Sequence, residues 1–265
     1  MWMTERLRRC GIRAVSPIVD VTNYVMLEYS QPLHPFDLNK LNEKIVVRKA
    51  LKDEPLKVLS GEEVKLSDNT LVIADAKGPV AIAGIFGGEN SGIDENTTDV
   101  VLESAFFSPD AIKGRARQYG LDTDASHRFE RGVDSEGQRR AMERATALLI
   151  HIAGGNAGPI REEVSSENLP KHNSITLRLS HLEKVLGISV PKEQVEFILT
   201  HLGMKPQAIE GGFKAVSPSF RFDIAIEEDL IEEVARMYGY DNIPNKTPVN
   251  TLEIVHDKEE FVSDR

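Results

Sequence analysis

The sequence has a single cysteine in 265 residues, no long apolar run and few aromatic side chains. One cysteine, Cys10, excludes a disulfide within the chain and fits a reducing compartment. No stretch approaches the roughly 18 consecutive apolar residues of a membrane-spanning helix, and no basic-then-apolar leader precedes the first domain. We therefore expect a soluble, cytoplasmic protein. With 40% hydrophobic residues, the chain can still bury the cores of one large or two ordinary domains.

Positive charge is also scarce. The formal net charge of -10 argues against a general nucleic-acid binder, which normally carries a basic surplus. Any contact with a polyanion must therefore be local. The densest group of bases is diluted by acids, so a solvated helix face is at least as good an interpretation. Its members are Lys113, Arg115, Arg117, Arg128, Arg131, Arg139, Arg140 and Arg144.

The first 163 residues change between helical and strand patterns. Ser16-Pro17 is typical of an N-cap followed by proline at the first helical position, and predicts a helix to about Tyr29. We expect a turn over 31–37 to end it. Short β-branched runs between Gly-, Asn- and Asp-rich turns predict strands, and two further helices follow. The expected strands are 44–49, 70–74, 79–86 and 99–106, and the helices are 109–119 and 135–153. This pattern predicts an α/β (α+β) domain with a mixed or antiparallel sheet.

The polar stretch 162–174 has almost no residues for a core, and we place a domain boundary there. The expected organisation is a first domain over 1–163, a linker over 164–174, a second domain over 175–246 and a tail over 247–265. A strand at 175–179 precedes two short helices, 180–186 and 191–202, joined by a glycine turn, which indicates a helix-turn-helix. A hairpin at Gly211-Gly212 and a strand at 213–216 would supply a wing. The second domain is thus predicted to be small and winged helix-turn-helix-like.

The segment 122–134 concentrates side chains with long hydrogen-bonding reach. It holds three aspartates, a glutamate, two arginines, a histidine and two hydroxyls, with almost nothing apolar. No helical or strand period runs through it, so we expect a loop. Ordinary surface loops are richer in Gly, Pro, Asn and Ser. The composition therefore favours a functional role.

A second polar feature is acidic. Residues 223–233 include six acids and no base, and three of these acids, Asp229, Glu232 and Glu233, fall at positions i, i+3 and i+4 of an expected helix. Acids at a helix N-terminus complement its dipole, which explains Glu227 and Glu228 well and Glu232 and Glu233 poorly. Carboxylates in a partly hydrated cluster suit Mg²⁺. A metal or a cationic partner remains an alternative to a purely structural role.

Three isolated features remain ambiguous. His34 lies in the turn after the first long helix, where a single histidine is more often structural than catalytic. The glycine-rich stretch 84–88 lacks the ending and the spacing of a phosphate loop, and instead suggests close approach of a backbone or a ligand. Glu103 lies in an otherwise apolar strand and needs a partner or a water-filled pocket. No nucleophile–base pair is evident.

Several segments, in this order along the chain, are recognisable. The first group resembles the editing domain of the bacterial phenylalanyl-tRNA synthetase beta subunit, and the second resembles the winged-helix-like domain that follows it. The first group is 19–25, 31–34, 84–88, 103–107 and 123–134, and the second is 218–224, 228–236 and 238–244. Because members of this family are about three times longer, the chain looks like a fragment without the tRNA-binding N-terminal module or the C-terminal modules. Proline at position 35, where a small residue is expected, is a departure that affects the orientation of His34.

The resemblance implies an enzyme, phenylalanine–tRNA ligase, of which this part would carry only the hydrolysis of tyrosine wrongly esterified to tRNA(Phe). Position by position, it implies that Glu103 accepts a hydrogen bond from the tyrosine hydroxyl. Gly87 and Ala125 would complete the substrate pocket, and His34 and Thr123 would serve catalysis. Such an activated ester needs only a placed water.

The resemblance also implies partners and cofactors. Asp223, Asp229, Glu232 and Glu233 match a magnesium site shared with the alpha subunit of an alpha2beta2 heterotetramer. ATP would be used by the holoenzyme and not bound by this part. The expected partners are the alpha subunit and tRNA(Phe), and we expect no membrane association. The acidic charge of the second domain argues against DNA binding. Two alternatives are a structural part that edits only within the full synthetase, and a helix-turn-helix nucleic-acid-binding protein.

Overall fold

The structure is a computed structural model that describes residues 2–171 and 174–245. The predicted tail over 247–265 lies outside these residues. Two compact units are present: residues 1–173 with 217–225, and residues 174–216 with 226–265. Each is described by itself. In the described residues, no helix is long and apolar enough to cross a membrane.

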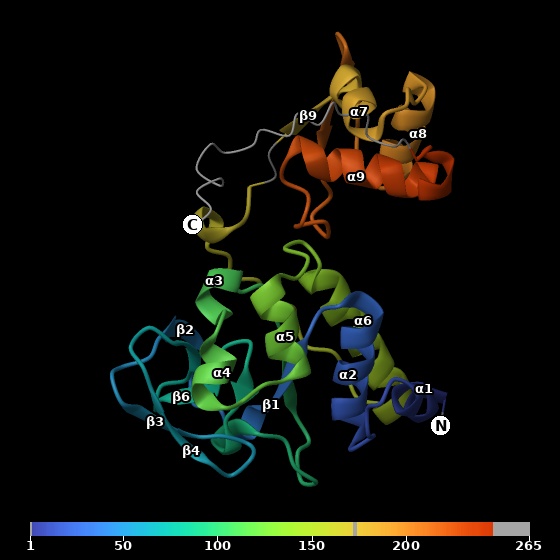
Figure 1. Cartoon of the computed structure of the whole chain (residues 1–265). Coiled ribbons are helices and arrows are strands. Elements are labelled where there is room, and N and C mark those ends of the chain that lie inside the picture. Colours follow the sequence, from blue (N-terminus) through green and yellow to red (C-terminus); the bar gives the residue numbers. More distant parts are fainter. Residues whose placement is uncertain (1, 172–173, 246–265) are drawn as a thin grey trace, which may run out of the picture. The chain divides into compact units, whose positions relative to one another are not determined.

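The first unit begins with two helices that pack on a later one (Figure 1). These are α1 (Trp2–Arg9), α2 (Pro17–Tyr29) and α6 (Gln138–Ala153). Ser16 is the N-cap of α2, where its hydroxyl accepts a 3.4 Å hydrogen bond from the amide of Val19, so the predicted helix start is confirmed. Leu7, Val21 and Ala145 are buried in the core that joins the three helices.

All strand pairs in the first unit are antiparallel. A four-stranded sheet has the order β2-β5-β6-β7, and two further pairs are β3-β4 and β1-β8. Their bounds are β1 Leu33–Asp37, β2 Val46–Lys49, β3 Glu54–Lys57, β4 Glu63–Leu66, β5 Leu71–Ala74, β6 Pro79–Ile82, β7 Phe86–Gly87 and β8 Val100–Ser104. Single turns of 3-10 helix, η1 (Leu38–Lys40) and η2 (Glu89–Ser91), follow β1 and β7. The predicted antiparallel strands are thus present.

Three predictions for this unit are wrong. The segment 31–37 is not only a turn, because Leu33–Asp37 pairs with β8 as strand β1. The helix expected over 109–119 is split into α3 (Pro109–Ile112) and α4 (Arg115–Tyr119) at Gly114, whose φ is +77°. The expected loop at 122–134 contains helix α5 (Asp124–Arg131), which buries Phe129 in the main core.

The second unit combines three helices with a three-stranded antiparallel sheet of order β10-β11-β9. Its elements are β9 Ser174–Arg178, α7 Leu179–Leu186, α8 Lys192–His201, β10 Gln207–Ile209, β11 Gly212–Val216 and α9 Glu227–Tyr238. Short 3-10 turns lie at η3 (Ser166–Asn168), in the first unit, and at η4 (Tyr240–Asn242), after α9. The predicted helix pair and hairpin are present. The mixed helix and antiparallel-sheet character predicted for the whole chain is confirmed.

Candidate functional site

The ribbon β1-β8 lies between two cores and presents a different set of side chains to each. Leu33 and Leu102 pack against the helical core of α1, α2 and α6. On the alternate positions Phe36 enters the main core of the sheet, and His34 lies on the same face because successive side chains of a strand point to opposite sides. His34 and Glu103 are direct partners in the register of the ribbon. The structure therefore brings these two predicted site residues side by side.

The imidazole of His34 is held by packing. Its ring centroid lies 4.5 Å from that of Phe36 in an edge-to-face arrangement. A Cβ added to Gly87 would lie 2.5 Å from Cε1 and 2.7 Å from Nε2 of His34, so only glycine lets this backbone approach the ring. The Leu59 side chain covers the same glycine, with Cδ1 at 2.9 Å from that added Cβ. Gly87 is thus a wall of the site.

Burial changes the ionisation of both polar residues. The Nε2 atom of His34 is buried and has no hydrogen-bond partner among the described residues. Burial lowers the pKa of the His34 imidazole to about 4, so the ring is neutral at pH 7. Burial raises the pKa of the Glu103 carboxyl to about 8, so it is mostly protonated at pH 7. Glu103 as a residue is half-buried, with its carboxyl deep enough for burial to raise its pKa.

Thr123 joins this group through the backbone before Gly87. Its hydroxyl donates a 3.0 Å hydrogen bond to the carbonyl of Ile85. As the N-cap of α5, the same oxygen accepts a 3.0 Å bond from the amide of Ser126. In return the Ser126 hydroxyl accepts from the Thr123 amide at 2.9 Å. Both functions of the Thr123 hydroxyl are therefore already used in holding α5 in place, and Ala125 in its first turn packs against the main core.

Sequence reasoning missed Leu59 and Ser126. The Thr-x-x-Ser spacing at 123–126 is a capping pattern that could have indicated both α5 and Ser126. Leu59 follows β3 and carried no detectable signal, because its contact with the glycines comes from the folding of the β3-β4 hairpin. Of the five residues expected in the pocket, three are connected by register or direct contact: His34, Glu103 and Gly87. Thr123 is linked to them through Ile85, two residues before Gly87, and Ala125 follows two positions after Thr123.

The four acids of the expected magnesium site have different interactions and different degrees of burial. Asp223 belongs to the first unit, where its carboxylate is held 2.7 Å from Arg221, which lowers its pKa. Asp229 accepts a 2.9 Å hydrogen bond from the Ile226 amide at the start of α9. Glu233 is buried with an ion pair of 2.6 Å to Arg236, whereas Glu232 is exposed.

In the described residues, no three His, Cys, Asp or Glu side chains lie close enough to hold a metal ion. The magnesium site expected at these four acids stays a prediction. Glu227 and Glu228 interact with Arg178 and His181 at 2.6 and 3.4 Å. The acidic start of α9 is therefore partly neutralised within the second unit.

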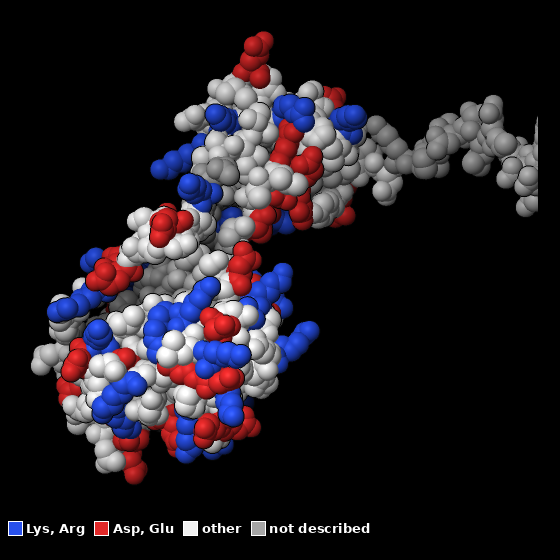
Figure 2. Space-filling view, turned by 90° about the vertical axis from the view of Figure 1, so that its left-hand side faces the viewer, with Lys and Arg blue, Asp and Glu red and all other residues white. Residues whose placement is uncertain are grey.

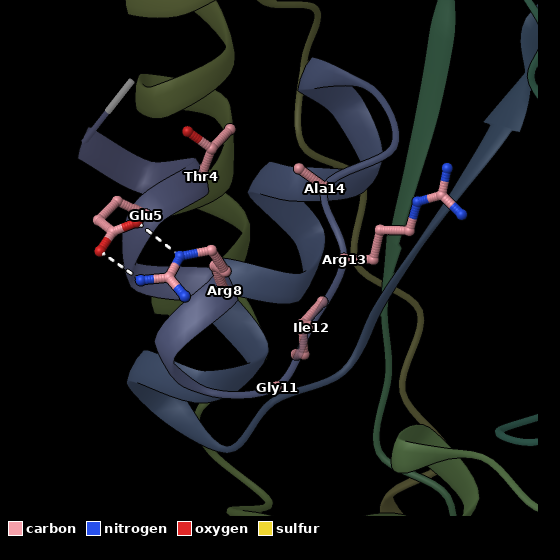
Figure 3. Close-up of a pocket in the computed structure, with 7 residues that line it drawn as sticks. All are labelled: Thr4, Glu5, Arg8, Gly11, Ile12, Arg13 and Ala14. Carbon is pink, nitrogen blue, oxygen red and sulfur yellow. Dashed lines mark hydrogen bonds and ion pairs between the residues drawn. The ribbon is translucent and has the colours of Figure 1, made fainter.

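A cavity of about 620 Å³ lies elsewhere in the first unit, between α1 and the loop that follows it (Figure 3). It contains none of the predicted site residues; its lining is Thr4, Glu5, Arg8, Gly11, Ile12, Arg13 and Ala14. Arg8 is turned toward Glu5, with which it forms hydrogen bonds of 2.8 and 2.9 Å. Because its charged groups already satisfy each other at the surface, we favour the His34–Glu103 region as the reactive site.

Two domain families match the chain. Residues 1–154 match the B3/4 domain, and residues 175–240 match the tRNA synthetase B5 domain. Together these domains define a component of the aminoacyl-tRNA synthetase class.

Curated relatives specify which component it is. Over 98% of its length the chain is 57% identical to the phenylalanine–tRNA ligase beta subunit of Aliivibrio fischeri. It is 56% identical to that of Vibrio cholerae over 95% of its length, and 59% identical to that of Photorhabdus laumondii over 92%. The chain belongs to the phenylalanine–tRNA ligase beta subunit family.

The chain covers 33%, 32% and 31% of these three relatives, about a third of their length. A solved N-terminal fragment of the phenylalanyl-tRNA synthetase beta subunit from Pyrococcus horikoshii is 16% identical, with a TM-score of 0.43, over 84% of this chain and 65% of that one. That likeness is too weak to support an argument about the fold.

Proposed function

We propose that the first unit hydrolyses the ester bond of tyrosine wrongly attached to tRNA(Phe). The observation that carries this proposal is the pairing of His34 with Glu103 on one face of the β1-β8 ribbon. A site of this kind is needed because tyrosine differs from phenylalanine by one hydroxyl, which an apolar synthetic pocket excludes poorly. A second site that binds this hydroxyl would prefer the tyrosyl ester over the phenylalanyl ester, and so hydrolyse the wrong product.

Glu103 is the selector in this proposal. Its half-buried position lets the carboxyl meet the hydroxyl of a tyrosine side chain. In its protonated form the group can accept one hydrogen bond and donate another. A hydrogen bond to a charged acceptor stabilises by about 1.5–3 kcal/mol, or roughly 10- to 150-fold. The neutral form would discriminate less, because hydrogen bonds between neutral groups contribute only about 0.5–1.5 kcal/mol.

His34 is the proposed acceptor for the hydrolytic water. Its Nε2 is buried without a partner among the described residues, and its lowered pKa keeps the ring neutral at pH 7. A neutral imidazole nitrogen can accept a hydrogen bond from water and take up its proton as the water attacks the ester carbon. The ester carbon–oxygen bond then breaks, and the proton passes to the departing ribose oxygen.

Thr123 has a supporting role. Because its hydroxyl already donates to Ile85 and accepts from Ser126, it positions the start of α5 and does not act on the ester. Because Gly87 has no side chain, the ring of His34 can pack against its backbone. The small side chain of Ala125 is proposed to leave space in the pocket. This assigns one catalytic side chain, one selector and three residues that shape the site.

For the second unit we propose a winged-helix-like docking domain. Its α7–α8 pair and β10-β11 hairpin support that interpretation. The proposed partner is the alpha subunit, within a heterotetramer whose aminoacylation uses ATP and acts on tRNA(Phe). A shared Mg²⁺ site at Asp223, Asp229, Glu232 and Glu233 stays a prediction. No step of the hydrolysis depends on it.

The test is deacylation of preformed Tyr-tRNA(Phe) and Phe-tRNA(Phe) by this chain, by Glu103→Gln and by the control Glu136→Gln, whose side chain is exposed. We expect faster loss of the tyrosyl ester. Because the Glu103 carboxyl is mostly protonated at pH 7, the preference over phenylalanine should fall by roughly 2- to 12-fold in Glu103→Gln. The control should behave like the original chain. No hydrolysis by the folded protein would refute the proposal for this chain.

A further inference from the structure

The basic group noted in the sequence divides into two kinds. Five of its eight members are ion-paired within the first unit: Arg128 with Asp124 at 2.9 Å, Arg131 with Glu130 at 2.8 Å, Arg139 with Glu143 at 2.9 Å, Arg140 with Asp134 at 3.4 Å and Arg144 with Glu28 at 2.7 Å. In the lower part of Figure 2, which shows the side of this unit that carries β3 and α4, blue and red side chains are also interspersed. These five arginines form the solvated, neutralised face considered from the sequence.

The other three bases lie together at the α3–α4 break. Lys113 ends α3, and Arg115 and Arg117 belong to α4. Residues 111–121 contain no acid. Lys113 and Arg117 are exposed, and among the described residues neither of their side chains has a hydrogen bond or an ion pair. We refer to these three residues as the α4 basic cluster.

Arg115 is the most informative member of the cluster. Its Nη1 donates a 3.2 Å hydrogen bond to the side-chain oxygen of Gln118. Its Nε is buried and has no partner among the described residues. A buried donor left unpaired costs about 1–3 kcal/mol. A ligand with several strong acceptor oxygens would remove that cost, and an arginine fork matches phosphate geometry.

The cluster is held firmly and close to the site. Ala116 and Leu121 are buried in the main core. The Tyr119 hydroxyl accepts a 2.9 Å hydrogen bond from the amide of Ser67 and lies 2.6 Å from the Thr70 hydroxyl. Thr123 follows Arg117 by six residues, so their Cα atoms are at most about 22 Å apart. A strand of RNA bound at α4 could therefore reach the pocket.

We propose that Lys113, Arg115 and Arg117 bind phosphates of the RNA strand whose 3′ end carries the amino acid into the His34–Glu103 site. The proposal rests on the hydrolytic function proposed above. Neutralisation of phosphates by lysine and arginine releases counterions and makes binding salt-dependent. Because the net charge of the chain is -10, this local cluster must supply the attraction.

The experiment measures binding of a fluorescent RNA hairpin with a single-stranded 3′ tail by anisotropy across a salt series. The test variant is Lys113→Gln/Arg117→Gln. The control is Arg139→Gln/Arg140→Gln, which removes the same charge from ion-paired positions of α6. Two lost phosphate contacts should weaken binding about 25-fold at 0.1 M salt and lower the log–log salt slope by about 1.4. The control should change affinity less than about threefold.

Three results would overturn the proposal: no binding by the original chain at 50 mM salt, equal affinity in the test variant, or equal losses in both variants. Kinetics with Tyr-tRNA(Phe) separate this proposal from the hydrolytic one. We expect the test variant to raise KM and leave kcat unchanged. If the original chain and the test variant hydrolyse Tyr-tRNA(Phe) with the same KM, the phosphate-binding role of the α4 basic cluster is wrong and the hydrolytic function stands. If RNA binding by the original chain depends on the cluster but the chain does not hydrolyse Tyr-tRNA(Phe), the proposed editing function is wrong and the RNA-binding role stands.

Discussion

The side-chain amide of Gln31 donates a 2.8 Å hydrogen bond to the carbonyl oxygen of Ala105 and so joins the two strands at one end of the β1-β8 ribbon. The same nitrogen donates to the carbonyl of Pro32 at 3.1 Å. The side-chain oxygen of Gln31 accepts a 3.1 Å bond from Gln138 at the start of α6. Gln31 is only 2% exposed. This buried amide therefore fixes the ribbon on which His34 and Glu103 face each other.

Replacement of Gln31 by leucine should destabilise the protein. The change removes the donor shared by the carbonyls of Pro32 and Ala105. It also removes one of the two acceptors of the Gln138 amide, which still donates to the Asp134 carbonyl. We expect a loss of about 2–4 kcal/mol in the free energy of unfolding. Urea unfolding measures it. Gln194→Leu, at an exposed amide of α8, should cost less than about 0.5 kcal/mol. Equal stability of the two variants would show that the bridge contributes nothing.

Gly87→Ala should displace the ring of His34. The added Cβ would lie 2.5 Å from Cε1 of that ring, and overpacking of this kind costs about 1–3 kcal/mol. The control is Gly158→Ala, where the added atom meets nothing within 4 Å. A double-mutant cycle with His34→Ala gives the decisive measurement. Removal of the ring makes room for the methyl group, so the combined loss should be smaller than the sum; strict additivity would contradict the contact.

Glu103→Gln should make stability less sensitive to pH between about 4.5 and 8. The Glu103 pKa is about 8 in the folded protein, against an ordinary value of 4.5. As pH rises from 4.5 to 8, the unfolded chain loses its proton first, so the folded state of the original protein loses stability over that window. The variant lacks this loss. Its advantage should grow to on the order of 1–2 kcal/mol, allowing for partial solvation of a half-buried group.

The measurement is urea unfolding at pH 4, 6 and 9, with Glu136→Gln as an exposed control that should show no trend. His34 acts in the opposite direction. Its pKa falls from 6.5 to about 4, so its contribution to stability is lost as pH decreases through that window. An advantage of Glu103→Gln that is constant with pH would mean that the carboxyl ionises normally.

Local signals were enough to predict some elements. Helix α2 follows from its Ser16-Pro17 start, and strands such as β5 from β-branched residues bounded by turns. These signals act over a few residues and do not depend on the rest of the chain. Strand β1 was missed because it contains Pro35 beside His34 and resembles a turn. A two-stranded ribbon tolerates proline at an edge, and the partner that makes it a strand lies far along the sequence.

The candidate site was less predictable from the sequence than these local elements. The pattern of residues marked Glu103 as an unusual acid and left His34 ambiguous; only the resemblance to a family grouped them. Their meeting depends on the β1-β8 register, and the shifts in their pKa values depend on burial, neither of which periodicity reveals. Helix α5 was missed because four of its eight side chains are charged, and its one large apolar side chain in the core is the ring of Phe129.

Thr123 provides a test of support as distinct from catalysis. Thr123→Ser keeps a hydroxyl that can serve both Ile85 and Ser126. Thr123→Val keeps the shape, loses the N-cap and leaves the Ile85 carbonyl unpaired. We expect the valine variant to lose about 1–3 kcal/mol of unfolding free energy and the serine variant to stay close to the original. Thr98→Val, at an exposed hydroxyl, is the matched control.

Hydrolysis of Tyr-tRNA(Phe) separates the two roles. If Thr123 only positions α5, its valine variant should lose rate in proportion to the displacement of the pocket, and the pH profile of kcat should keep its shape. A group that takes part in proton transfer would instead change that profile, because its removal deletes one ionisation from the reaction. If Thr123→Val changes the pH profile of kcat without changing stability, Thr123 takes part in the reaction and is not only a positioning residue.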